Sequence, residues 1–88
     1  MDYDILFRGV KDIVLNHDPI NLISGGAPTD EYDSEINKIV KLIPSDKKKF
    51  GLEVYKIFAD SFEEQTWPRI KYDIIAQEIL SKFSSLFE

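Results

Sequence analysis

The chain has 88 residues, a length that fits a single domain. Hydrophobic residues make up 43% of it, with six Phe, four Tyr and one Trp, so its composition excludes a disordered protein. The lack of cysteine excludes a disulfide scaffold and thiolate metal or redox sites, and it favours a cytoplasmic protein. The net charge of -5 disfavours nucleic acid and anionic membranes as partners.

The acidic start of the chain has no basic flank followed by an apolar run, as a signal peptide would. The first predicted helix runs over residues 3–16. Its predicted apolar face comprises Ile5, Leu6, Val10, Ile13 and Val14. Gly9 weakens this helix by about 1 kcal/mol relative to alanine. His17 follows, and the dipole at a helix C-terminus favours a histidine there, so we interpret it as structural rather than as a base or metal ligand.

The next segment interrupts the helical pattern. Pro19 biases Asp18 away from helical dihedral angles, and Gly25, Gly26 and Pro28 then force a change of direction. No nucleophile or phosphate-loop motif surrounds these glycines, so we predict no catalytic residue and no cofactor. The sequence therefore predicts a structural elbow made by Pro19, Gly25, Gly26 and Pro28.

A second helix is predicted to begin after the elbow, with Asp30 as its cap and Pro44 as its stop. Asp33 and Glu35 lie in its first turns, where the helix dipole favours negative charge. An apolar stripe marks its buried face, namely Tyr32, Ile36, Ile39, Val40 and Ile43.

A third helix is predicted to begin after a cap at Ser45 or Asp46, with Gly51 as a weak point. Its apolar face comprises Phe50, Val54, Ile57, Phe58 and Phe62. The Lys47-Lys48-Lys49 run has no interleaved arginine or aromatic residue, so we interpret it as a solvated face rather than a nucleic-acid site.

A fourth helix is predicted from Pro68, in its first turn, nearly to the end of the chain. Its stripe comprises Tyr72, Ile75, Ala76, Ile79, Phe83 and Leu86. Ile74 and Leu80 widen the apolar arc beyond what one neighbouring helix covers, which predicts a central helix or a homodimer contact. Residues 1–88 are thus predicted to form one domain, an all-α bundle of about four helices.

Five acidic residues remain to be explained, namely Asp18, Asp30, Glu31, Asp33 and Glu35. Helix capping and dipole compensation account for most of them, and their order does not match a calcium-binding loop. On a helix, Asp30 and Asp33 share one face whereas Glu31 and Glu35 share another, so one metal ion could not readily collect these four carboxylates. We treat these five residues as a candidate surface for a basic protein partner.

The pattern in residues 18–36 resembles the signature of the DUF1871 (YugE-like) family of short bacterial proteins. The resemblance consists of Asp-Pro followed by a hydrophobic residue, then Gly-Ala-Pro, then Asp-Glu-Tyr-Asp. It departs at His17, where the family pattern has a tryptophan. The resemblance implies a helical protein of bacterial origin, and it implies little about mechanism because the members of the family are uncharacterised.

The hypothesis favoured by these observations is a non-enzymatic interaction or regulatory module. One version is an immunity-type inhibitor whose negative charge occludes the basic site of a toxin. Two alternatives stay open at this point. The first is a small metal-dependent or catalytic protein that uses the segment from Asp18 to Glu35, and the second is a structural homo-oligomer.

Overall fold

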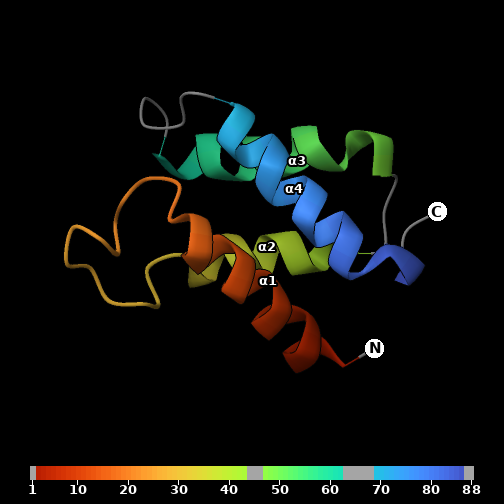
Figure 1. Cartoon of the computed structure of the whole chain (residues 1–88), viewed down its shortest axis with the longest axis horizontal. Helices are drawn as coiled ribbons and strands as arrows, with labels where there is room; N and C mark the ends of the chain where they lie inside the picture. Colours follow the sequence, from red (N-terminus) through yellow and green to blue (C-terminus); the bar gives the residue numbers. More distant parts are fainter. Residues whose placement is uncertain (1, 44–46, 63–68, 87–88) are drawn as a thin grey trace.

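The computed structural model of the chain describes residues 2–43, 47–62 and 69–86. These residues contain four α-helices and a short 3-10 helix and no strand, which confirms the predicted all-α class. The elements are α1 (Tyr3–His17), α2 (Asp33–Lys41), α3 (Lys47–Phe62), α4 (Ile70–Lys82) and η2 (Ser84–Leu86). α1 packs against α2 and α4, and α3 packs against the same two helices, which makes a bundle (Figure 1).

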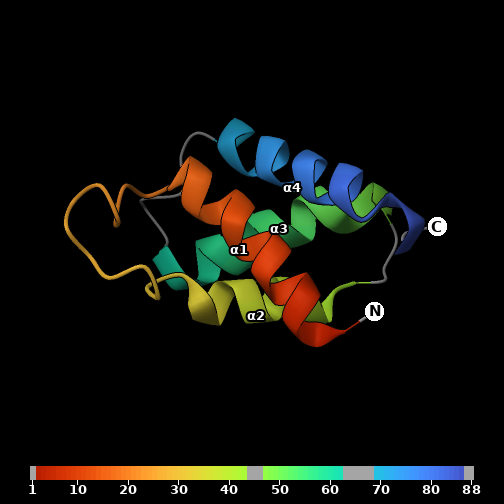
Figure 2. The same cartoon turned by 60° about the horizontal axis from the view of Figure 1, so that its bottom comes forward.

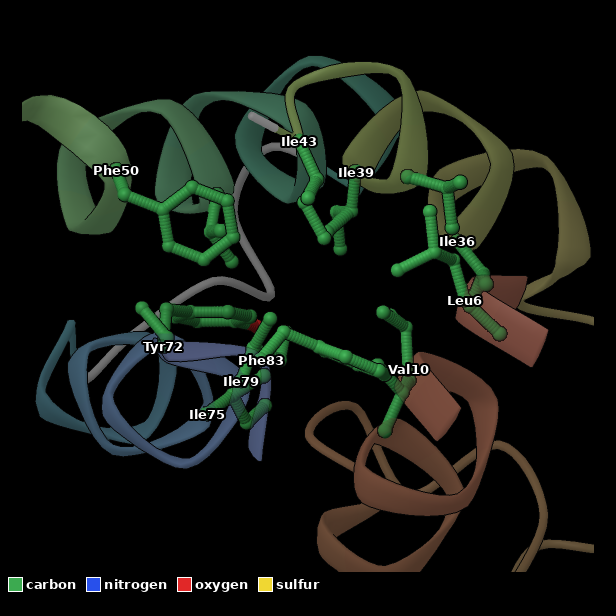
Figure 3. Packing of buried hydrophobic residues seen from close by; sticks show 14 of the residues in the cluster. Leu6, Val10, Ile36, Ile39, Ile43, Phe50, Tyr72, Ile75, Ile79 and Phe83 are labelled. Carbon is green, nitrogen blue, oxygen red and sulfur yellow. The ribbon is translucent and has the colours of Figure 1, made fainter. Parts of the chain in front are cut away.

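The core lies between the four helices, and each contributes side chains from its predicted apolar stripe (Figure 3). Burying one such side chain fully contributes roughly 1.5–3 kcal/mol to stability. The fully buried members include Val10, Val14, Ile36, Ile39, Val54, Phe58, Tyr72, Ile75 and Ile79. One stripe prediction is wrong, because Ile5 in the first turn of α1 is 56% exposed.

The start of α2 differs from the prediction. The helix begins at Asp33, its N-cap position is Tyr32, and no side chain caps it. Asp30 lies one turn earlier, where its carbonyl accepts a hydrogen bond from the Asp33 amide at 3.1 Å. The chain between Pro28 and Asp33 is therefore a succession of turns, so the Asp30 carboxylate is too early in the chain to cap the helix.

The other helix ends agree more closely with the prediction from the sequence. Asp2 caps α1, accepting a hydrogen bond from the Asp4 amide at 3.1 Å. α4 ends at Lys82, earlier than predicted, because the chain continues as the separate turn η2. The predicted roles of Pro44, Ser45, Asp46 and Pro68 lie outside the described residues.

α1 and α4 run in opposite directions. Gly9 near the middle of α1 lies against Phe83 after the end of α4, whereas Pro19 after α1 contacts Lys71 at the start of α4 (Nζ to carbonyl oxygen, 3.4 Å). The loop between α1 and α2 consequently projects from the end of the bundle opposite the N-terminus (Figures 1 and 2). None of the helices in the described ranges is long and apolar enough to cross a membrane.

Tyr72 of α4 is fully buried, and its hydroxyl has no hydrogen-bond partner among the described residues. Burial raises its pKa from 10.0 to about 12. A buried unpaired hydroxyl costs free energy, so Tyr72→Phe is expected to leave stability unchanged or raise it by up to about 1 kcal/mol at pH 7. Urea unfolding measures this change, and a loss above about 1 kcal/mol would reveal a partner for the hydroxyl.

The same variant has a pH signature. Tyrosine in the unfolded chain ionises near pH 10, whereas folded Tyr72 keeps its proton up to about pH 12, so rising pH favours unfolding across that window. The wild-type protein should lose stability from pH 10 to 12. In Tyr72→Phe that loss should be smaller.

Candidate functional site

The loop of residues 18–32, here called the Asp18 loop, starts from an unusual backbone conformation. Asp18 has a φ of 44°, in the left-handed region, and its amide donates to the Val14 carbonyl at 2.8 Å. Aspartate tolerates this region better than most residues, because its short side chain makes local hydrogen bonds. Asp18 therefore both ends α1 and turns the chain into the loop.

The Asp18 carboxylate organises the first part of the loop. Its Oδ1 accepts hydrogen bonds from the Ile23 amide at 3.1 Å and the Tyr32 hydroxyl at 2.8 Å, and its Oδ2 accepts from the Ser24 amide at 2.9 Å. Burial alone raises the pKa of this carboxyl, but hydrogen bonds from Ser24, Tyr32 and Ile23 together hold the pKa below 3.8. The ionised form is thus the one that the loop stabilises.

Tyr32 ties the end of the loop to its beginning. Its ring is fully buried and packs edge-on against Phe58 and Phe62 of α3, with ring centroids 6.1 and 6.2 Å away. Its hydroxyl donates to Asp18 and accepts from the Ile20 amide at 3.2 Å. Burial, followed by the hydrogen bond to Asp18, raises the pKa of Tyr32 to about 12. The two ends of the loop are therefore held together at the bundle.

Between these ends the chain is held by turns. The Ala27 amide donates to the Leu22 carbonyl at 2.9 Å, and Asn21 and Gly26 have φ angles of 58° and 102°. Of the predicted elbow residues, Pro19 is buried, whereas Gly25, Gly26 and Pro28 are exposed. Only Gly26 among the described glycines adopts a positive φ, which a side chain would strain. The ends of the loop are close together, as in an Ω-loop, because the Tyr32 hydroxyl contacts Asp18.

The five acidic candidates do not form one surface. Asp30 and Glu31 are exposed on the loop, and Asp18 has its carboxylate occupied by the contacts above. Asp33 pairs with Lys11 of α1 at 2.9 Å. Glu35 is only 5% exposed, so its prediction as a surface residue is wrong.

Glu35 is buried because it lies on the apolar stripe of α2, three residues after Tyr32 and four before Ile39. Its Oε2 accepts a hydrogen bond from the Ser61 hydroxyl of α3 at 3.1 Å, and its Oε1 has no partner in the described part of the chain. This spacing was the sequence signal for burial. An acidic residue at a stripe position indicates an inward side chain as well as a first-turn charge.

His17 lies in the last turn of α1, as predicted, and its Nε2 contacts Glu78 of α4. Within the described ranges, no three histidine or acidic side chains gather where they could hold a metal ion. Asp18 and Tyr32 thus form the best-defined polar arrangement of the loop, and their contacts are with the protein itself. No protein-family model matches this chain, and no curated protein or solved structure is significantly similar to it.

Proposed function

We propose that the protein is a non-enzymatic interaction module that presents the Asp18 loop to a basic region of another protein. The observation that supports this proposal is a loop with exposed Asp30 and Glu31 whose base is closed by the buried Tyr32 and by Asp18. Loops held in one conformation by a rigid scaffold are frequent recognition elements, because little conformational entropy is lost on binding.

The charge of the chain supports a basic surface as the partner. The net charge of -5 attracts a basic surface and accelerates its association at low salt. An immunity-type inhibitor that covers the basic site of a toxin is one form of this proposal. A bacterial origin and a cytoplasmic location belong to the same proposal, supported by the resemblance of residues 18–36 to the DUF1871 family and by the lack of cysteine.

A charge-neutralising double variant tests the loop directly. Asp30→Asn with Glu31→Gln removes two exposed charges and touches no described side-chain hydrogen bond, so folding should be unaffected. The probe is the product of an adjacent toxin-like gene, mixed with the protein across a salt series. We expect the variant to associate several-fold more slowly at low salt, with a weaker salt dependence, because exposed charges mainly set the association rate.

The matched control is Asp4→Asn with Asp12→Asn, which removes the same charge from exposed positions of α1. This control should associate at nearly the wild-type rate. Equal slowing in both double variants would show that total charge, rather than the loop, attracts the partner. Absence of binding at low salt would overturn the proposal for that partner.

A further inference from the structure

The outer face of α4 exposes two large apolar side chains. Ile70 and Ile74 are 60% and 46% exposed, and they lie one helical turn apart. They belong to a shallow hollow of 450 Å³ whose lining residues are Ile70, Asp73, Ile74, Gln77, Glu78 and Ser81. Single exposed isoleucines are common, but two adjacent ones in a hollow make a surface that a partner can cover.

The bundle itself does not use this face. α4 already buries the opposite side of the helix in the core, through Tyr72, Ile75, Ala76 and Ile79. The exposed parts of Ile70 and Ile74, 60% and 46% of these residues, are not buried by folding. The wide apolar arc predicted for the fourth helix therefore corresponds to one core face and one uncovered face.

The charges around the hollow indicate what covers it. Asp73 and Glu78 are its ionisable residues, and both are acidic. Arg69 approaches Asp73 only at 3.6 Å between exposed side chains, an ion pair that contributes little, and Glu78 also contacts His17. A second copy of the chain would place acidic residues opposite acidic residues, which disfavours a homodimer through this face.

We propose that the outer face of α4 binds a basic amphipathic helix of a partner protein. Its apolar side chains cover Ile70 and Ile74, and its lysines or arginines approach Asp73 and Glu78. The helix pairs along α4, since the hollow follows residues spaced three, four, seven and eight apart on that helix. This inference stands on α4 alone and does not require the Asp18 loop to bind anything.

The probe is a synthetic 18-residue helix of leucine and lysine with one apolar face, titrated into the isotope-labelled full-length protein. We expect amide shifts centred on Ile70, Ile74 and Gln77. Ile74→Ser should weaken binding roughly tenfold, because it removes the apolar surface that one isoleucine would bury against the peptide. The matched control Ile5→Ser removes an isoleucine of α1 that is 56% exposed, against 46% for Ile74, and should leave binding unchanged.

Three results would overturn the inference. The first is a helix of leucine and glutamate that binds as tightly as the helix of leucine and lysine. The second is an equal weakening of binding by Ile74→Ser and by Ile5→Ser. The third is a dimer, detected by light scattering, that Ile74→Ser dissociates. The last would identify a second copy as the occupant. Asp30→Asn with Glu31→Gln should still bind the peptide, so failure of the loop proposal and failure of this one give different results.

Discussion

Asp18→Asn is expected to destabilise the protein by about 2–3 kcal/mol, because it disrupts charge-assisted hydrogen bonds that organise the loop. Asparagine has one acceptor oxygen, which can still face Tyr32 and Ile23. Its amide nitrogen must then face the Ser24 amide, which donates to Oδ2 at 2.9 Å in the wild-type protein. Two donors would oppose each other there. Asparagine tolerates the left-handed backbone, so the loss measures the carboxylate and not backbone strain.

Tyr32→Phe provides the companion measurement. It removes the hydroxyl that joins Asp18 to Ile20 and keeps the ring between Phe58 and Phe62, so we expect a loss of about 1–2 kcal/mol. Combined with Asp18→Asn, the double variant should lose less than the sum of the two, because Asp18→Asn already weakens the hydrogen bond that Tyr32→Phe removes, by replacing a charged acceptor with a neutral one. Urea unfolding of the wild-type protein, the two single variants and the double variant measures this coupling. Additive losses, or an Asp18→Asn variant as stable as wild type, would contradict the role given to this contact.

Acid unfolding gives an independent check on Asp18. Its pKa in the folded protein lies below 3.8, so the stabilisation is present at higher pH and is lost as the pH falls through the folded value. Wild-type stability should therefore decline at pH values below 3.8. Asp18→Asn has no carboxylate to protonate at this position, so its decline over the same range should be shallower.

Periodicity predicted the core well because burial follows spacing along a helix. Ile36, Ile39 and Ile43 of α2 occupy the predicted face, and all three are buried. The prediction failed where the spacing did not fit the stripe. At about 100° per residue, Ile5 lies about 140° around α1 from Val10 and about 180° from Val14, so it points away from the buried face and is exposed.

The candidate site was less predictable, because its contacts depend on the path of the chain. Tyr32 was predicted as an apolar stripe residue, and its hydroxyl reaches a carboxylate 14 positions earlier. That contact requires the left-handed conformations of Asp18 and Asn21, which no helical or strand period encodes. Glu35 was predicted to lie on the surface because of its charge, yet it is buried, as its spacing along α2 indicated.

Gly9 is the clearest case in which a tertiary contact overrides a local rule. By helix propensity alone, glycine weakens α1 by about 1 kcal/mol. In the structure, a Cβ at this position would lie 2.5 Å from the tip of the Phe83 ring. Phe83 is 5% exposed and points toward Val10, so the ring has little room to withdraw (Figure 3). The absence of a side chain at Gly9 is what lets α4 end against α1.

Gly9→Ala is therefore expected to destabilise the protein by about 1–2 kcal/mol, since overpacking outweighs the gain in helix propensity. Gly51→Ala is the matched control within α3. A Cβ there meets only Asp73 Oδ1, at an ordinary 3.5 Å, so propensity should prevail and stabilise the protein by about 0.5–1 kcal/mol. Thermal and urea unfolding of both variants should give shifts of opposite sign.

A third variant assigns the cause of the Gly9→Ala effect. Phe83→Leu shortens the side chain that meets Gly9, so Gly9→Ala should cost less in that background than in the wild-type protein. An equal cost in both backgrounds would place the conflict elsewhere on α1. If Gly9→Ala and Gly51→Ala instead stabilise equally, helix propensity alone governs both positions, and the close approach of Phe83 to α1 does not constrain this sequence.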